Sequence, residues 1–190
     1  GIKNQCRVFT DNPPVGLQIG HDAALISLDI TLEEPKKALN FLAHVLQAYL
    51  TTAGIANRSG VLTNSALASL VLASGGVKRD FLLLGARSIQ IARQRTNART
   101  VGVQDVNEAA GDAGKQKRAE LEDDAASSIG QAALRLSALE AVRAFAIDEH
   151  HCSFFRVNFR DKENLQEEYR LLQSLMDLRM LHLVKSSLSE

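Results

Sequence analysis

The sequence is poor in the residues that build disulfide frameworks and metal ribbons. Only two of its 190 residues are cysteines, Cys6 and Cys152, and their wide separation excludes a disulfide-stapled domain and a zinc ribbon. Neither charge sign is in excess, with 22 basic against 22 acidic side chains, which excludes bulk electrostatic binding of nucleic acid but leaves room for a local basic face. No apolar stretch approaches the ~20 residues of a membrane span, and no signal-peptide pattern opens the chain. The sequence predicts a soluble, cytoplasmic protein without a membrane partner.

The residues that are present favour an ordinary folded chain. Apolar residues make up 45% and charged residues 23%, which is typical of globular proteins and excludes disorder. The chain starts at Gly1 without a methionine, and it ends soon after an apolar run at Leu181–Val184. That run predicts a strand, and an unpaired strand at a terminus leaves its backbone groups exposed. We therefore interpret the chain as a fragment of a longer protein.

Helical periodicity fills the middle of the chain. A strand is predicted at Ala24–Ile30, followed by a helix that starts with Thr31, acids and Pro35, and that stops near Gly54. Thr63 or Asn64 caps the next helix. The remaining predicted helices cover residues 78–95, a short segment from 103, and a long stretch over 115–147 that is interrupted or kinked near 130.

The apolar period changes to two near the end of the chain. Phe154–Phe159 alternates as a strand does, Asp161 is placed to cap a following helix, and Leu181–Val184 predicts a last strand. The two histidines before the first of these strands invite a metal interpretation. Because neighbouring side chains on a strand point to opposite faces, His150 and His151 cannot readily share one ion. We expect a polar turn there, and no metal.

The segment Ser74–Phe81 carries the most chemical information. Two glycines at a helix–helix junction allow close backbone approach or a positive φ. Arg79 follows in the first turn of the next helix, where the positive end of the helix dipole disfavours a cation, so this placement calls for an anionic partner such as a polyphosphate. On the residues alone, the favoured alternative is a glycine-ended turn followed by a solvated pair, Lys78 and Arg79.

The context of this segment adds a family resemblance. The pattern Gly-Gly-x-x-Arg-Asp-Phe-Leu follows a predicted strand and an acid-and-proline-initiated helix by about forty residues. Over roughly residues 24–112, this arrangement resembles the lid region of AAA+ and related STAND P-loop ATPases. In that family a small helical bundle follows the nucleotide-binding sheet and supplies an arginine, called sensor 2, to the bound triphosphate.

The resemblance implies roles for particular residues. Arg79 matches the sensor-2 arginine and is the catalytic candidate; Gly75 and Gly76 match the turn before it and complete the candidate nucleotide-binding set. Val103–Val106 matches the start of the last helix of the lid. Lys78 departs from the family, which usually has proline there.

The phosphate loop of such an ATPase is missing from the sequence. The nearest approach to Gly-x-x-x-x-Gly-Lys-Ser/Thr is Gly114-Lys115, but Gln116 follows it and Ala109 stands where the first glycine belongs. No apolar strand ends in paired acids that could hold magnesium. The resemblance thus implies that ATP and Mg belong to an upstream core of the parent protein, and we expect no cofactor and no hydrolysis in this chain.

The C-terminal segment resembles a truncated winged helix. Its strands would be Phe154–Phe159 and Leu181–Val184, its helices would cover Glu163–Arg179, and the wing would need a further strand. Such modules commonly bind DNA through a helix in the major groove. Here acids dominate the start of the helical segment, and acids repel phosphates. We favour a protein partner over DNA. The acids are Glu163, Glu167 and Glu168, and the bases are Arg170 and Arg179.

A cluster of basic residues follows the Gly-Gly turn. It holds Lys78, Arg79, Arg87, Arg93, Arg95 and Arg99. Contact with nucleotide or nucleic acid is one interpretation. The favoured one is a solvated helix face that pairs with the acids at 120–124.

These observations together predict a mainly α fold with a few β-strands, in which a helical lid-like bundle precedes a truncated winged-helix-like domain. The predicted parts are the tail of an ATPase core (1–32), the lid-like bundle (33–112), a long connecting helix (113–148) and the winged-helix-like domain (149–190). The predicted function is that of the C-terminal regulatory fragment of a P-loop ATPase. Its lid would contact the upstream core and transmit the nucleotide state to a protein partner of the winged helix. The alternative is a stand-alone helical adaptor, or a winged-helix DNA-binding regulator, in which the Gly-Gly-Arg turn is purely structural.

Overall fold

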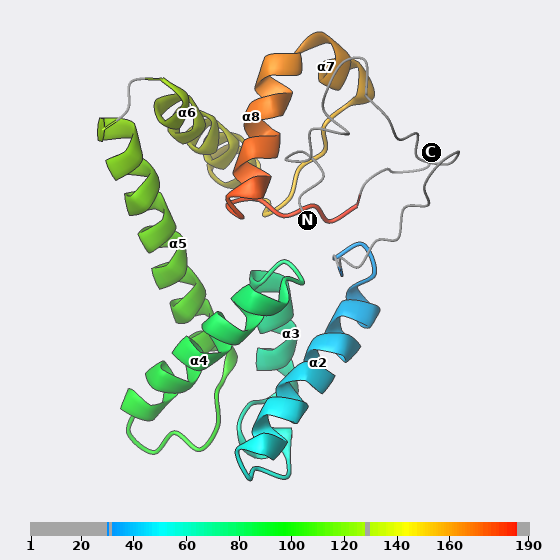
Figure 1. Cartoon of the computed structure of the whole chain (residues 1–190), viewed down its shortest axis with the longest axis vertical. Coiled ribbons are helices and arrows are strands. Elements are labelled where there is room, and N and C mark those ends of the chain that lie inside the picture. The colour runs from blue at the N-terminus through cyan, green and yellow to red at the C-terminus, as the bar shows by residue number, and fades with distance from the viewer. Residues whose placement is uncertain (1–29, 31, 128–129, 186–190) are drawn as a thin grey trace, which may run out of the picture.

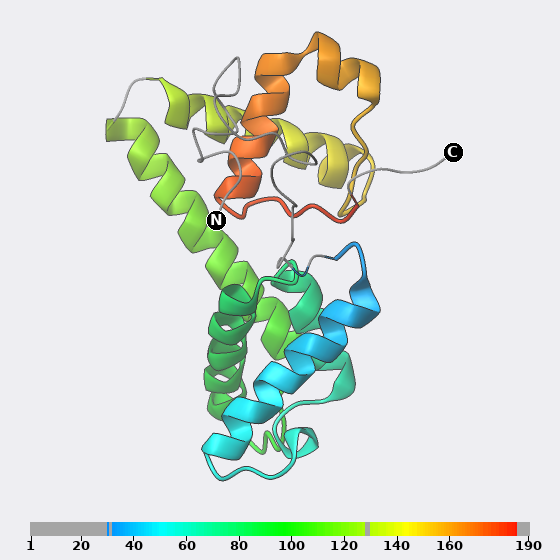
Figure 2. The same ribbon diagram turned by 45° about the vertical axis from the view of Figure 1, so that its right-hand side comes forward.

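The computed structural model of the chain describes residues 30, 32–127 and 130–185. They form two helical lobes that a long helix connects (Figures 1 and 2). The N-terminal lobe contains α2 (Pro35–Thr52), α3 (Asn64–Ala73), α4 (Lys78–Gln94) and the first part of α5 (Val103–Ser127). The C-terminal lobe contains α6 (Gln131–Arg143), α7 (Phe159–Asn164) and α8 (Gln166–Asp177). A short 3-10 turn, η2 (Arg58–Gly60), precedes α3, and a π-helical segment, η3 (Ala144–Glu149), follows α6.

The helices of the N-terminal lobe begin and end largely where local signals place them. Pro35 occupies the first position of α2, where a missing N–H leaves nothing unpaired. Thr63 caps α3, because its side-chain oxygen accepts from the N–H of Ala66 at 3.1 Å. Gly54, just past the end of α2, has a φ of +80°, the left-handed conformation that commonly ends a helix. The helices predicted up to residue 95 are therefore present, with Thr63 as the cap of the second. The first of them begins later than expected, because Glu34 is its N-cap residue and no acid lies in its first turn; Thr31, the expected cap, lies outside the described residues.

The core of the N-terminal lobe draws one large apolar side chain from each of its helices. Leu42 of α2, Leu70 of α3, Phe81 of α4 and Val106 of α5 are at most 1% exposed. Their positions follow the three- and four-residue spacing of apolar residues in each helix. A core shared by four helices holds the α3–α4 turn at a defined place on the lobe.

The beginning of α5 is fixed by a buried carboxylate. Asp105 lies in the first turn of the helix, is 1% exposed, and accepts hydrogen bonds from the N–H of Gly102 and from Arg95, both at 2.7 Å. An acid in this place satisfies an otherwise orphaned helix donor and suits the helix dipole. Two arginines of the predicted basic face thus pair with acids other than those at 120–124. Arg95 pairs with Asp105, and Arg87 pairs with Asp112 at 3.1 Å.

The helix pattern after residue 102 differs from the prediction. A short helix from 103 and a separate long helix over 115–147 were expected, whereas α5 runs continuously from Val103 to Ser127. The interruption predicted near 130 is confirmed: α5 ends at Ser127, and Gly130, at a φ of +141°, precedes α6. Because α6 packs back against α5, with Arg118 on Glu140 at 2.9 Å, the segment 113–148 is not one long connecting helix.

The two strands predicted within the described C-terminal residues are not formed. The backbone at 154–158 joins no sheet, Phe159 begins α7, and residues 181–184 are irregular. A strand needs a partner for its ladder hydrogen bonds, and alternating apolar residues do not supply one. Phe154 and Phe159 are instead 73% and 71% exposed. The winged-helix interpretation therefore lacks both of its strands here; the strand predicted at 24–30 falls mostly on residues outside the described part.

The predicted helix start at Asp161 is also wrong. Asn158 is the N-cap residue of α7, without a side-chain cap, and Asp161 lies inside its first turn. The helical stretch expected at 163–179 divides at Leu165 into α7 and α8. The mainly helical part of the fold prediction is confirmed, while no strand occurs in the part of the chain that the structure describes.

Candidate functional site at the start of helix α4

The Gly-Gly turn between α3 and α4 is a left-handed helix ending. Gly75 and Gly76 have φ angles of +59° and +79°. The N–H of Gly75 donates to the carbonyl of Leu72 at 3.0 Å, and that of Gly76 donates to Val71 at 3.2 Å. This pair of bonds is the Schellman arrangement, which satisfies the last carbonyls of a helix. The positive φ expected of these glycines is confirmed, and both residues are buried.

Arg79 lies open to solvent in the first turn of α4. Its side chain is exposed, as expected, and within the described residues it makes no hydrogen bond or ion pair. Val77, the N-cap residue, offers no side-chain acceptor to the free N–H groups of the helix. An uncapped helix start and an unpaired guanidinium therefore lie together, and both favour an anion.

Asp80, the neighbour of Arg79, is bound to the other lobe. Its Oδ1 accepts from Arg179 at 2.8 Å, and the side chains of the two residues are 15% and 38% exposed. The second oxygen, Oδ2, is buried and has no hydrogen-bond partner within the described residues. The first turn of α4 thus presents an open cation at one position and a partly buried ion pair at the next.

His182, in the segment that follows α8, packs on Gly75. A Cβ atom added to Gly75 would lie only 2.6 Å from Cε1 of the His182 ring, closer than real contacts allow. Lys117 of α5 adds a further link, since its Nζ donates to the carbonyl of Arg179 at 3.1 Å. We call these five residues, Gly75, Asp80, Lys117, Arg179 and His182, the interlobe cluster.

The structure therefore separates the three residues that the sequence grouped into one site. Arg79 is accessible, whereas Gly75 lies under His182 and Gly76 is buried. Sequence reasoning missed Arg179 and His182, which are about a hundred residues from the turn. The one local signal was the acid at position 80, which we interpreted only as part of the family pattern.

The imidazole of His182 has a lowered pKa. Burial lowers it from the ordinary value of 6.5, the positive charge of Lys117 lowers it further, Asp80 opposes this and Arg179 adds to it. Since the folded form binds the proton more weakly than the unfolded form, the contribution of neutral His182 to stability is complete above pH 6.5. That contribution is lost as the pH falls through the lowered pKa.

We therefore expect acidification below pH 6.5 to destabilise the folded chain more when His182 is present. Chemical denaturation of the native chain and of His182→Gln across this range measures the effect. All other side chains are common to both proteins, so the difference between the two pH slopes reports His182. Equal slopes would contradict a buried neutral imidazole.

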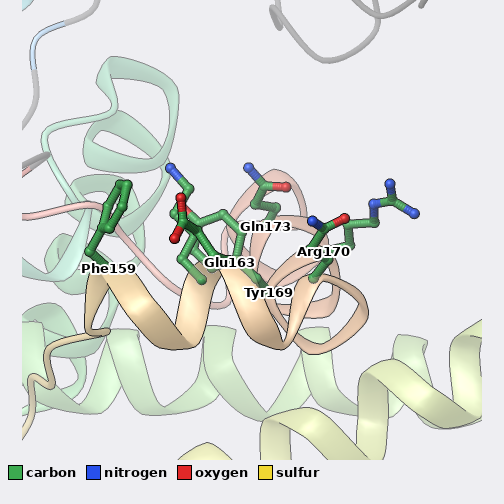
Figure 3. A pocket seen from close by; sticks show the side chains of 7 residues that line it. Phe159, Glu163, Tyr169, Arg170 and Gln173 are labelled. Atoms are coloured by element: carbon green, nitrogen blue, oxygen red, sulfur yellow. The ribbon is translucent and has the colours of Figure 1, made fainter.

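A second concave surface lies on α7 and α8 (Figure 3). Its lining residues are Phe159, Lys162, Glu163, Gln166, Tyr169, Arg170 and Gln173. The Lys162 ammonium lies 5.1 Å from the centre of the Tyr169 ring, within cation–π range. Acidic and basic groups alternate along this shallow surface, so it has no strong preference for phosphate.

An apolar groove runs between α2 and α4 in the N-terminal lobe. Tyr49, Leu82 and Ile89 are among the side chains that line it. Tyr49 is 60% exposed, so part of the lining is open to solvent. The groove holds few polar groups and offers no reactive side chain.

The histidine pair forms the expected polar turn. The His150 ring packs edge-on against Phe145 with centroids 4.5 Å apart, and His151 Nδ1 lies 3.1 Å from the carbonyl of Ile147. Among the described residues there is no group of three His, Cys, Asp or Glu side chains that could hold a metal ion.

Comparison with known proteins identifies no relative of this chain: no protein-family model, curated protein or solved structure matches it. Within residues 30, 32–127 and 130–185, none of the helices has the length and apolar character needed to cross a bilayer.

Proposed function

We propose that this chain is the C-terminal regulatory part of a P-loop ATPase. Its N-terminal lobe acts as the lid, and Arg79 reaches the phosphates of an ATP–Mg complex bound by an upstream core of the same protein. The observation that carries the proposal is the exposed, unpaired guanidinium of Arg79 in the uncapped first turn of α4. The C-terminal lobe would pass the nucleotide state on to a protein partner.

The electrostatics of the α4 start support a phosphate ligand. An exposed arginine at the positive end of a helix is disfavoured unless an anion neutralises it. A triphosphate offers several oxygens to a guanidinium and to free helix N–H groups at once. Lys78, also exposed, adds a second positive charge at the same helix end.

Two features support a regulatory rather than a hydrolytic role for the chain itself. The sequence has no phosphate loop and no paired acids after an apolar strand. The mixed charges on α7 and α8 fit a protein surface better than a phosphate backbone. Catalysis would therefore need the upstream core, with the lid supplying a positioned charge.

The proposal is tested by phosphate release from ATP and magnesium. The purified 190-residue chain should show no turnover, whereas the longer protein that contains it should hydrolyse ATP. ATP hydrolysis that stays with the purified 190-residue chain through successive chromatography columns would overturn the proposal. So would a parent protein without any phosphate loop.

The second candidate function is a stand-alone helical adaptor. The observation that favours it is the packing of His182 on Gly75, which gives the Gly-Gly turn a structural reason to exist. The apolar groove between α2 and α4 would then be the contact surface. ATP binding by the protein that contains this chain separates the two candidates, because an adaptor has no nucleotide for Arg79 to contact.

A further inference from the structure

We propose that the interlobe cluster is a latch that holds the C-terminal lobe against the first turn of α4. The latch itself follows from the contacts among the described residues. Only its use as a reader of nucleotide state depends on the proposed function. It is a conformational device: closed, it fixes α8 and the segment after it relative to the Gly-Gly turn; open, it frees them.

Arg179 supplies the first reason for this inference. It follows the end of α8, where the N–H of Arg179 donates to Met176 and that of Met180 donates to Leu175, both at 2.9 Å. This is again a Schellman ending, and Arg179 occupies its left-handed position at a φ of +58°. Glycine normally fills that position because side chains are disfavoured there.

The contacts of Arg179 explain why an arginine is useful in this strained conformation. Its guanidinium pairs with Asp80 of α4, and its carbonyl accepts from Lys117 of α5. A residue that holds three separate elements together offsets the backbone cost of its own conformation. The strain thus points to the interlobe contact rather than to the helix ending, which glycine would serve better.

Gly75 supplies the second, independent reason. It is the left-handed residue at the end of α3, as Arg179 is at the end of α8, so the two helix endings meet in the cluster. His182 fills the space that a side chain at position 75 would need. Gly54 ends α2 with a similar φ of +80°, but a Cβ there would meet nothing within 4 Å. The two glycines therefore differ in whether the other lobe lies against them.

The position of Asp80 connects the latch with Arg79. The two residues are consecutive in the first turn of α4, a hydrogen-bonded unit that moves as one body. A ligand that shifts this turn when it binds Arg79 would therefore also displace the carboxylate that holds Arg179. In this way ligand binding at Arg79 would change the ion pair that holds the C-terminal lobe.

The latch is tested by measuring the distance between the lobes with spin labels. Labels at the exposed positions Gln90 of α4 and Glu163 of α7, in a chain whose Cys6 and Cys152 are changed to serine, report the separation. The labelled chain without further substitutions should give one narrow distance distribution. Asp80→Asn and Arg179→Gly should each add a second, displaced population, and the charge exchange of Asp80→Arg with Arg179→Asp should recover most of the narrow one.

Matched glycine variants test the His182 contact in the same assay. Gly75→Ala and Gly54→Ala place a side chain on the same left-handed backbone, but only the first collides with His182. We expect Gly75→Ala to displace the lobes and Gly54→Ala to leave the distribution narrow. Adding His182→Ala to Gly75→Ala should then narrow the distribution again.

The outcome does not depend on ATP hydrolysis, because no nucleotide is present in the measurement. An unchanged narrow distribution in Asp80→Asn, Arg179→Gly and Gly75→Ala would overturn the latch and leave the ATPase proposal intact. If Arg179 served only to end α8, Arg179→Gly would keep the lobes together, since glycine relieves the left-handed strain. Displacement of the lobes in that variant therefore supports the latch specifically.

Discussion

Replacing Arg79 with alanine should slow ATP hydrolysis by the proposed parent ATPase about 10²–10³-fold, as removal of one transition-state charge contact typically does. The side chain is exposed and has no partner among the described residues. Its loss should therefore cost at most about 1 kcal/mol of folding stability. Steady-state phosphate release measures the first effect, and thermal unfolding of the 190-residue chain measures the second.

The neighbouring lysine provides the control for this experiment. Lys78 is also exposed at the start of α4 and carries the same charge, but the resemblance gives it no role. Lys78→Ala should leave turnover within a few-fold of the parent protein. A lower melting temperature in Arg79→Ala, with unchanged turnover, would mean that the Gly-Gly-Arg turn has only a structural role. The ATPase proposal would then lose the residue on which it mainly depends.

The part of the fold that could be predicted from sequence is the part that local signals determine. The start of α2 at Pro35 and the cap of α3 at Thr63 depend on residues within one helical turn. The positive φ of Gly75 follows from its place between two helical patterns. Arg79 could likewise be expected at the surface, because a buried guanidinium needs an anionic partner, and the resemblance assigns that role to a phosphate held by an upstream core.

The wrong predictions concern structure that depends on distant partners. Phe154–Phe159 alternates as a strand does, but a strand exists only where another strand pairs with it. The ion pair between Asp80 and Arg179 joins residues 99 apart in the chain, and no pattern in the sequence couples them. The same applies to the contact of His182 with Gly75. From the sequence, this glycine is explained by its φ alone, whereas the second reason for a glycine at position 75 is a side chain of the other lobe.

The continuity of α5 shows a third kind of limit. Gly111 and Gly114 lie inside it, and such residues lower the intrinsic tendency to form a helix. The sequence predicts a short helix from 103 and a separate long one over 115–147. The helix packs against α3, α4 and α6, and this tertiary packing outweighs the local cost of the glycines. The interruption expected near 130 does occur, with Gly130 as the N-cap residue of α6.

Phe81→Ala should have the largest effect on stability, a loss of about 3–5 kcal/mol in the free energy of unfolding. Phe81 is 0% exposed and packs in the core of the N-terminal lobe with Leu70 and Val71 of α3. Truncation leaves a cavity that a core shared by four helices can close only in part. Since small domains have about 5–15 kcal/mol in total, this variant should be barely stable at 37 °C.

Leu83→Ala is the matched control, because Leu83 lies two residues further along α4 and is 59% exposed. Denaturation with urea should show that the free energy of unfolding of Leu83→Ala lies within about 0.5 kcal/mol of that of the unsubstituted chain. Phe81 also holds the first turn of α4 in place, so its loss should disturb Arg79 and Asp80 indirectly. The two kinds of residue can then be told apart: Phe81→Ala lowers turnover together with stability, whereas Arg79→Ala lowers turnover alone. A Phe81→Ala chain as stable as Leu83→Ala would show that α4 is not anchored in the core, and the position of the whole candidate site would have to be revised.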